Sequence, residues 1–358
     1  MALRFAWVLE FIERAVGCVP CRKTCVDAKV DWIMIIVRSP LRITLGGGGT
    51  DLPSYYLDHG GFVISAAINK YVYVTVNESF RRRISLKYSK VEDVATVDEV
   101  EHPVIREALR LLNISGSVDI DTISDIPQGT GMGSSGSFTT ALLQALHLFR
   151  RETLTRQQLA EEAFHIEHDI LGQHCGRQDQ YIAAIGGLTC FTFEQNGVTY
   201  RPLRVDPETL ANLEDSLLLF FTGYARSASS ILADQDVKSQ QSDAVMLENL
   251  HYTKLLGFKS RGALETGDLP LFGSLLHEHW IHKRARSGGM SNSNIDELYQ
   301  LALDNGALGG KLVGAGGGGF LMFYTENKSQ LRRAMRRVCL REVRICFDFG
   351  GTEVMVHQ

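Results

Sequence analysis

One glycine-rich segment constrains this chain more than any other. It runs from Asp125 to Ser137 and reads Asp-Ile-Pro-Gln-Gly-Thr-Gly-Met-Gly-Ser-Ser-Gly-Ser. Apolar residues then recur at helical spacing, at Phe138, Ala141, Leu142, Ala145, Leu146 and Phe149. Glycine permits a positive φ and a close approach to a ligand, and the free N–H groups at a helix start attract anions. The segment therefore predicts a polyphosphate-binding loop in which Ser134 or Ser135 supplies a hydroxyl to a magnesium ion.

A single loop of this kind is also typical of a flexible surface segment before a core helix. Two further glycine clusters, Gly46 to Gly49 and Gly314 to Gly319, favour the functional interpretation. Three such loops in 358 residues indicate a cleft for a nucleotide and a second substrate. The loop lacks the Gly-Lys-Ser/Thr ending of a Walker A motif, and the element before it does not resemble a dinucleotide-binding βαβ unit.

Composition sets outer limits on the kind of protein. Hydrophobic residues make up 44% and charged residues 22%, as in an ordinary soluble globular protein. The formal net charge of −4 provides no electrostatic reason to expect a nucleic-acid partner. No apolar run is long enough to span a bilayer, so no membrane association is expected. The seven cysteines lack disulfide-framework spacing, which favours a reducing cytoplasm.

Residues 1–33 differ from the rest of the chain. Ala2 to Val16 could form a short amphipathic helix, but charged residues interrupt any signal-peptide core. Cys18, Cys21 and Cys25 could bind a metal, yet no second ligand pair with zinc-finger spacing follows, so an incidental cluster is the preferred interpretation. We assign this extension no function and expect Met34 to be the natural start.

Three carboxylates stand beside loops. Asp51 ends the first glycine run, where it could accept hydrogen bonds from sugar hydroxyls or cap the helix that begins near Pro53. Glu167 lies on a predicted helix from Leu159 to Leu171, directly before a second polar loop. Asp179 lies at the start of an apolar helical run after that loop, where it could act in catalysis or serve only as a cap.

The order of elements indicates an α+β protein rather than a regular βαβ repeat. Strands are expected at Ile35–Val37, Arg42–Leu45, Phe62–Ala67, Tyr71–Asn77, Val118–Ile123, Leu188–Phe193, Leu217–Phe221, Phe320–Tyr324, Val343–Phe349 and Glu353–Val356, with a hairpin turn at Asn196-Gly197. Further helices are expected at Val104–Leu112, Leu247–Thr266, Leu269–Arg284, Ile295–Asn305 and Lys328–Cys339. A boundary near residue 205 would divide two domains, 34–205 and 206–358, with the ligand at their junction.

Three ordered motifs resemble those of the GHMP kinases, the superfamily of galactokinase, homoserine kinase, mevalonate kinase and phosphomevalonate kinase. They are Ser39-Pro40-Leu41-Arg42 with Gly49-Thr50-Asp51, the run from Pro127 to Ser135, and the run from Val313 to Gly319. Within the superfamily, Arg38 to Tyr55, Gly176 to Tyr181 and Phe221-Thr222-Gly223 with Arg226-Ser227-Ala228 resemble the D-glycero-D-manno-heptose 7-phosphate kinase family. The resemblance extends from Met34 to the C-terminus.

This resemblance implies a ribosomal S5 domain 2-like N-terminal domain, which binds ATP, and a ferredoxin-like C-terminal domain. It implies that ATP, with Mg²⁺, phosphorylates the anomeric hydroxyl of a heptose 7-phosphate to give the 1,7-bisphosphate. Such products feed nucleotide-activated heptose synthesis for lipopolysaccharide, capsule or surface-layer glycans. A small-molecule sugar phosphate is the expected partner, and a homodimer is compatible with the sequence.

The resemblance also implies residue roles. Asp179 matches the catalytic base, Arg42 an arginine near the transferred phosphoryl group, and Ser134 and Glu167 the magnesium ligands. The ATP-binding residues would be Pro127, Gly129, Gly131, Met132, Gly133, Ser134 and Ser135. The substrate-binding residues would be Gly47, Gly48, Gly49, Thr50, Asp51, Gly316 and Gly317. Met132 replaces a common leucine, and Gly136-Ser137 replaces a frequent alanine pair, which could alter helix packing.

Other interpretations stay open at this point. No motif identifies the pocket for the 7-phosphate, and Arg81 to Arg83, Arg226, Lys283 and Lys311 are candidates only. Another GHMP sugar kinase, of the fucokinase or galactokinase kind, would tolerate the same first and second motifs. A non-catalytic sensor of sugar and ATP would be expected to lack Asp179 or Arg42, and both are present.

Overall fold

The structure is a computed structural model that describes residues 33–223, 229–241, 243–286 and 289–358. The predicted helix at Ala2 to Val16, the cluster of Cys18, Cys21 and Cys25, and the string at Arg226 to Ala228 lie outside these residues. Ile33–Gln358 form one compact unit. No helix in the described ranges is both long enough and apolar enough to cross a membrane.

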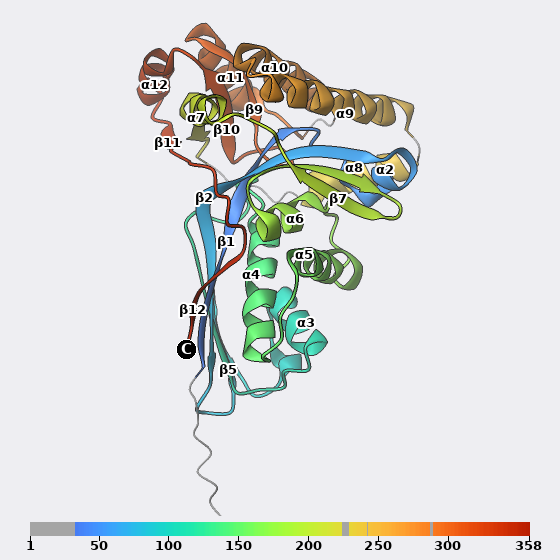
Figure 1. Cartoon of the computed structure of the whole chain (residues 1–358), viewed down its shortest axis with the longest axis vertical. Coiled ribbons are helices and arrows are strands. Elements are labelled where there is room, and N and C mark those ends of the chain that lie inside the picture. The colour runs from blue at the N-terminus through green and yellow to red at the C-terminus, as the bar shows by residue number, and fades with distance from the viewer. Residues whose placement is uncertain (1–32, 224–228, 242, 287–288) are drawn as a thin grey trace, which may run out of the picture. The chain divides into compact units, whose positions relative to one another are not determined.

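A sheet of eight strands forms the framework of the first half of the described chain (Figure 1). Its path runs in the order β12-β1-β2-β5-β3-β4, and β6 joins both β2 and β7. The strands are β1 (Met34–Gly46), β2 (Gly61–Glu78), β3 (Ile84–Lys87), β4 (Val91–Val94), β5 (Val118–Ser124), β6 (Leu188–Glu194), β7 (Gly197–Pro202) and β12 (Glu353–His357). The β6–β7 pairing, with Glu194 opposite Gly197, confirms the hairpin expected at Asn196-Gly197.

Strand β2 serves two neighbours because its two halves pair differently. Residues Gly61 to Ala66 pair with β6, whereas Val72 to Glu78 pair with β5. In the second half, Val72, Val74 and Val76 alternate onto the buried face, as the period-2 pattern predicts. The sequence predicted two separate strands in place of β1 and two in place of β2, and this prediction was wrong. Strand β1 runs through Pro40, where its pairing register shifts, and the Pro40 carbonyl accepts a hydrogen bond of 2.7 Å from the Ser137 hydroxyl.

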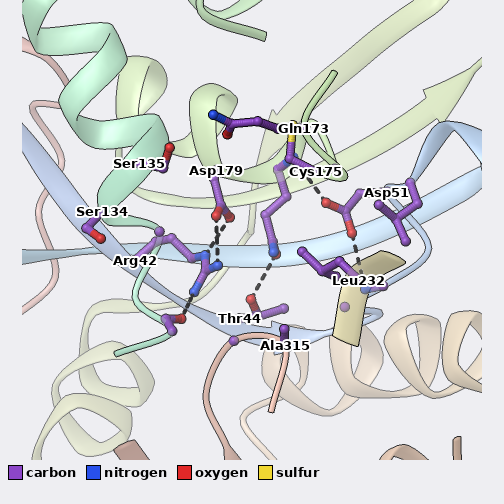
Figure 2. Close-up of a pocket in the computed structure, with 18 of the residues that line it drawn as sticks. Arg42, Thr44, Asp51, Ser134, Ser135, Gln173, Cys175, Asp179, Leu232 and Ala315 are labelled. Atoms are coloured by element: carbon purple, nitrogen blue, oxygen red, sulfur yellow. Dashed lines mark hydrogen bonds and ion pairs between the residues drawn. The ribbon is translucent and has the colours of Figure 1, made fainter. Parts of the chain in front are cut away.

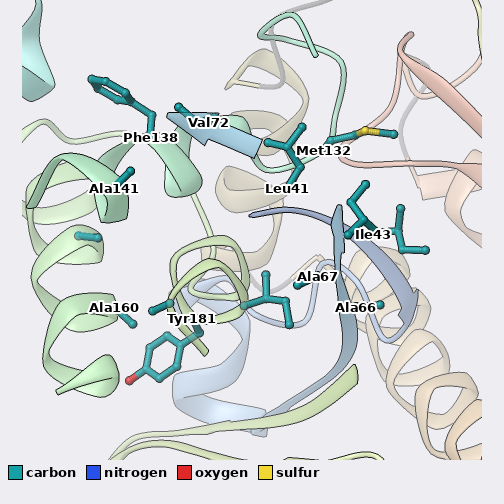
Figure 3. Close-up of a cluster of buried hydrophobic side chains, with 14 of the residues drawn as sticks. Leu41, Ile43, Ala66, Ala67, Val72, Met132, Phe138, Ala141, Ala160 and Tyr181 are labelled. Carbon is teal, nitrogen blue, oxygen red and sulfur yellow. The ribbon is translucent and has the colours of Figure 1, made fainter. Parts of the chain in front are cut away.

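Helices cover one face of this sheet (Figure 1). They are α3 (Pro103–Leu111), α4 (Ser134–Phe149), α5 (Arg156–Phe164) and α6 (Gln178–Ile185), while α2 (Pro53–His59) precedes β2 and the short helix η1 (Val97–Glu99) precedes α3. The predicted helix from Leu159 to Leu171 divides into α5 and a π-helical segment, η2 (His165–Ile170), that carries Glu167. The core between sheet and helices joins side chains such as Leu41, Ile43, Met132 and Phe138 (Figure 3).

A second sheet of four strands lies in the second half of the described chain. Its order is β11-β8-β10-β9, from β8 (Leu217–Phe221), β9 (Ala307–Leu312), β10 (Phe320–Thr325) and β11 (Arg341–Val343). The accompanying helices are α7 (Pro207–Ser216), α8 (Ser229–Gln240), α9 (Ala244–Glu265), α10 (Leu269–Arg286), α11 (Ser293–Asp304) and α12 (Lys328–Arg337).

Two chain segments here differ from expectation. A strand was expected at Val343–Phe349, but β11 ends at Val343 and only an isolated bridge joins Ile68 to Phe347. Strand β12, near the end of the chain, pairs with Ile35 to Arg38 of β1 and so belongs to the first sheet. The domain boundary near residue 205 stays a prediction, and β12 shows that the sheets do not divide at one point of the sequence.

Candidate active site

The central glycine loop and the start of α4 have the predicted geometry. Gly129, Gly131 and Gly133 have φ values of 76°, 83° and 74°, in the left-handed region. Gly133 directly precedes the first residue of α4, so the free N–H groups of the first helical turn border the loop. A Cβ on Gly131 would lie 2.4 Å from the Val313 carbonyl oxygen, because the loop packs directly against the third glycine cluster. The arrangement has the geometry of a helix-start anion site, and the close backbone contact requires glycine at position 131.

Arg42 and Asp179 form a bidentate ion pair beside the central glycine loop (Figure 2). The Nε and Nη2 groups of Arg42 donate to Oδ1 and Oδ2 of Asp179 at 2.8 Å and 3.0 Å. Arg42 also donates from Nη1 to the carbonyl of Gly131 and, through its backbone N–H, to the Met132 carbonyl at 3.0 Å. Helix α6 has no side-chain cap bond at its N-terminus, so the interpretation of Asp179 as a cap is wrong. Its carboxylate faces the arginine instead.

Asp51 is fixed by backbone donors from two segments. Its Oδ1 accepts from the Gly49 N–H at 3.1 Å, and its Oδ2 accepts from the Gln178 N–H at 3.3 Å. The residue before α2 is Leu52, and that helix start has no side-chain cap bond, so the prediction that Asp51 caps α2 is wrong; its Oδ2 instead bonds the first N–H of α6. Burial raises the pKa of Asp51, and the nearby Asp179 carboxylate raises it further. The first glycine run therefore places a polar acceptor at the wall of the site.

Glu167 lies below the loop, almost fully buried at 1% exposure. Its Oε1 accepts from the Thr139 hydroxyl and its Oε2 from the Gln180 amide at 2.8 Å, and the Ser135 hydroxyl also interacts with it. Burial raises the pKa of Glu167 to about 7, against the opposing effect of these hydrogen bonds. A π-helical segment presents this carboxylate, and such segments frequently occur at functional sites.

A cavity of about 410 Å³ brings these elements together (Figure 2). Predicted residues that line it are Arg42, Gly48, Gly49, Asp51, Gly129, Gly131, Gly133, Ser134, Ser135, Asp179, Lys283 and Lys311. In Figure 2 Ser134, Arg42 and Asp179 lie toward one end and Asp51 and Leu232 toward the other. The lining combines residues before position 205, such as Arg42 and Asp179, with residues after it, such as Leu232 and Lys311.

Other predicted site residues lie behind the wall. Gly47, Thr50, Pro127, Met132, Glu167, Gly316 and Gly317 are not part of the lining. The Thr50 hydroxyl donates to the carbonyls of Gly47 and Phe62 at 2.9 Å and 3.0 Å, so it holds the loop closed. Met132 packs in the core, and the Gly317 N–H donates to the Met290 carbonyl at 3.1 Å. Through their side chains or backbone bonds these residues shape the loops.

Of the residues predicted as candidates for a phosphate pocket, some line the cavity and others lie away from it. Arg81 and Arg82 are exposed at the turn between β2 and β3, and Arg83 pairs with Asp93 at 2.6 Å, away from the cavity. Lys283 and Lys311 line the cavity, whereas Arg226 lies outside the described residues.

Sequence reasoning overlooked several lining residues, among them Thr44, Gln178, Leu232, Gln235, His279 and Arg286. A signal existed for two of them. His279, Lys283 and Arg286 are spaced at i, i+4 and i+7, which places three basic side chains on one face of α10. The others have no local signal because tertiary packing alone brings them to the cavity.

Comparison with known proteins shows the family of the chain. The model of the GHMP kinases N terminal domain matches residues 100–187, and that of the GHMP kinases C terminal matches residues 260–341. The D-glycero-alpha-D-manno-heptose 7-phosphate kinase of Campylobacter jejuni is 30% identical over 318 residues, which cover 85% of this chain and 93% of the relative. A galactokinase of Roseiflexus is 27% identical over 82% of this chain and 84% of its own length.

A solved structure supports the same conclusion about fold. The crystal structure of a D-glycero-D-manno-heptose 1-phosphate kinase from Bacteroides thetaiotaomicron matches with a TM-score of 0.75 and 27% identity, over 90% of this chain and 99% of that one. The α+β fold of two sheets with their helices is therefore the GHMP kinase fold, as predicted. On the family models, the similarity to the Campylobacter kinase and the site geometry, the chain belongs to the GHMP kinases and is an ATP-dependent sugar kinase.

Proposed function

We propose that this kinase phosphorylates the anomeric hydroxyl of D-glycero-D-manno-heptose 7-phosphate and releases the 1,7-bisphosphate and ADP. The observation that carries the proposal is the Arg42–Asp179 pair, held beside the phosphate-type loop in a cavity that also contains Asp51. Phosphoryl transfer needs positioning, charge stabilisation and a proton acceptor, and this arrangement supplies each of them. The similarity to the Campylobacter heptose 7-phosphate kinase supports the choice of substrate.

In the proposed reaction, the acceptor hydroxyl donates a hydrogen bond to Asp179. A bond forms between that hydroxyl oxygen and the γ-phosphorus of ATP, the bond to the β–γ bridging oxygen breaks, and the proton passes to Asp179. Arg42 uses three of its five N–H groups in the bonds to Asp179 and Gly131. The two remaining N–H groups can donate to the oxygens of the transferred phosphoryl group, where negative charge accumulates.

We propose that Mg²⁺ accompanies ATP near Ser134 and Glu167. Both residues offer oxygen donors, which Mg²⁺ prefers, and the buried Glu167 carboxylate, with its raised pKa, would ionise more readily beside a cation. No group of three or more His, Cys, Asp or Glu among the described residues could hold a metal, so phosphate and water would complete the ligand set. When bound, the ion would neutralise phosphate charge.

The variant Glu167→Gln tests this role. Mg²⁺ should tighten the binding of an ATP analogue, and the Mg²⁺ concentration that gives half of this effect should be higher in the variant than in wild type. An unchanged concentration would refute the role of Glu167.

The setting of the reaction follows from the proposed substrate. The product would enter nucleotide-activated heptose synthesis for lipopolysaccharide or capsule, and a cytoplasmic location would give access to ATP. The described part of the chain holds four cysteines, all free thiols, which supports a reducing compartment.

The test is an ADP-release assay over a panel of acceptors. The panel contains D-glycero-D-manno-heptose 7-phosphate, the same heptose without phosphate, L-fucose, D-galactose and mevalonate. The proposal predicts the highest kcat/KM for heptose 7-phosphate. A preference for L-fucose or D-galactose would instead support a fucokinase-like or galactokinase-like activity on the same fold. Tight binding of sugar and ATP without turnover would indicate a sensor.

A further inference from the structure

Four basic side chains meet at one wall of the cavity, and we call them the cation cluster. His279, Lys283 and Arg286 come from one face of α10, and Lys311 comes from the neighbouring strand β9. All four line the cavity, yet they are only 3%, 7%, 8% and 3% exposed. The reaction proposed above assigns none of them a role.

The ammonium groups of this cluster have no carboxylate within ion-pair distance among the residues that the structure describes. Lys283 donates to the carbonyls of Leu312 and Gly314, so it holds the third glycine loop. Lys311 has the Nδ1 of His279 at 3.3 Å, which occupies one of its three donors. Within the described ranges, no other hydrogen-bond partner of its ammonium group is found, so its other two N–H bonds can donate to a group that enters the cavity.

Arg286 connects the cluster to the first glycine loop. Its Nε donates to Asn249 at 3.0 Å and its Nη2 to Thr253 at 2.8 Å, while its Nη1 lies 3.2 Å from the amide oxygen of Gln235. A Cβ on Gly49 would lie 2.4 Å from Nη1 of Arg286, so the guanidinium is packed against the loop expected to bind sugar. This contact places Arg286 beside the loop expected to bind the acceptor sugar.

Buried cations without anionic partners destabilise a fold, and strongly perturbed groups of this kind cluster at functional sites. Burial, together with the nearby charges of Arg42 and Arg286, lowers the pKa of Lys311 to about 7. The pKa of Lys283 falls in the same way, beside Lys311, Arg286 and Arg42, and burial also lowers the pKa of His279. Four basic side chains (Arg42, Lys283, Arg286 and Lys311) face two acidic ones, Asp51 and Asp179, across the cavity. Basic side chains therefore outnumber acidic ones around the cavity, and an entering phosphate dianion would favour the protonated form of Lys311.

We propose that Lys311 and Arg286, supported by Lys283 and His279, bind the phosphate monoester of the sugar substrate. This inference rests on the proposed function, because it identifies what recognises the phosphate carried by the acceptor. Charge-assisted hydrogen bonds to phosphate are strong, and those made in a buried site are stronger than those in water. The nucleotide phosphates would instead occupy the glycine loop and the start of α4, on the side of Ser134 (Figure 2).

The test is calorimetric binding, without ATP, of heptose 7-phosphate and of the same heptose without phosphate. Wild type should bind the phosphorylated sugar more tightly. Lys311→Met should weaken that binding by about 10- to 100-fold, the range for a lost charged hydrogen bond. It should leave the affinities for unphosphorylated heptose and for ADP nearly unchanged. Lys254→Met is the matched control, since Lys254 is a partly buried lysine outside the cavity that bonds the carbonyls of His59 and Gly60.

Two further readouts separate recognition from a structural role. Removing an unpaired buried charge should raise the Tm of Lys311→Met, whereas a lysine that stabilises the fold would lower it. At pH 8, binding of heptose 7-phosphate should take up a proton in wild type, because Lys311 is mostly neutral before the anion arrives. The uptake appears as a difference in apparent enthalpy between HEPES and Tris buffers, and it should be absent in Lys311→Met.

Each result decides for or against the inference. Loss of ADP or ATP-analogue affinity in Lys311→Met would assign the cluster to the nucleotide and overturn it. Unchanged affinity for heptose 7-phosphate would overturn it as well. If wild type binds both sugars equally, the proposed function fails too; if wild type prefers the phosphorylated sugar and the variant keeps that preference, only this inference fails.

Discussion

The substitution Asp179→Asn tests the residue on which the proposed chemistry depends. It keeps the size of the side chain, removes its charge, and leaves one carbonyl oxygen that can still accept from Arg42. General-base catalysis typically contributes about 10²- to 10⁴-fold, so kcat should fall by that factor, which corresponds to about 3–5 kcal/mol of activation free energy. ATP affinity should change little, because the loop at Gly129 to Ser135 is formed by another segment.

The structure also sets the expected cost in stability. Arg42 has a side chain that is 6% exposed, and Asp179 has one that is 27% exposed. The variant leaves one donor of a buried guanidinium without its anion, which costs about 1–3 kcal/mol of unfolding free energy. The variant must still fold despite this loss of unfolding free energy. The far-UV spectrum and the thermal shift with an ATP analogue are therefore measured first.

Single-turnover and steady-state assays then give kcat and the KM for each substrate. Glu353→Gln is the matched control, because Glu353 of β12 pairs at 2.7 Å with Arg38, which lies on β1 like Arg42 but outside the cavity. That pair is more exposed, at 25% and 37%, so its loss should cost less than about 1 kcal/mol and leave kcat unchanged. A folded Asp179→Asn variant with near-normal kcat would refute the catalytic role.

Three further predictions test other parts of the site and its scaffold. Gly136→Ala would put a Cβ 2.8 Å from the backbone of Asp179, so kcat should fall and the free energy of unfolding should drop by about 1–3 kcal/mol. The control Gly262→Ala, with open space around it, should not destabilise the protein. Burial lowers the pKa of His147, but the hydrogen bonds that its ring donates to Glu162 and Glu152 raise it by more, so the net shift is upward. The Tm advantage of wild type over His147→Gln should therefore be full below about pH 6.5 and shrink above it, as thermal melts across pH would reveal. Removal of residues 1–33 should leave kcat nearly unchanged, since every described residue that lines the cavity comes later in the chain, and a large loss in folded protein would contradict this.

Local sequence patterns were enough to predict much of the site. The three alternate glycines predicted a loop of positive φ before a helix, and Gly129, Gly131 and Gly133 adopt that conformation. Their information is local, because a backbone conformation that other residues rarely adopt can be inferred from the residue type alone. The alternation at Val72, Val74 and Val76 predicted a half-buried strand for the same reason.

Partners distant in sequence could not be predicted in this way. Arg42 and Asp179 are 137 positions apart, and nothing near Asp179 distinguishes a helix cap from a partner of an arginine. Strand β12 pairs with β1 although it lies near the opposite end of the chain. Loop closure brings such segments together only when the whole core forms, so their pairing is a property of the tertiary structure.

The cation cluster shows the same difference between what a local sequence pattern predicts and what tertiary packing decides. The basic spacing at His279, Lys283 and Arg286 was readable as one helix face, yet a basic face on a helix is usually in contact with solvent. Only the packing of α10 against β9 turned that face inward, added Lys311, and removed water from the ammonium groups. The sequence by itself determined which residues carry charge and which loops can bend, whereas the tertiary structure decided which charges are buried, because burial depends on the packing of segments distant in the sequence.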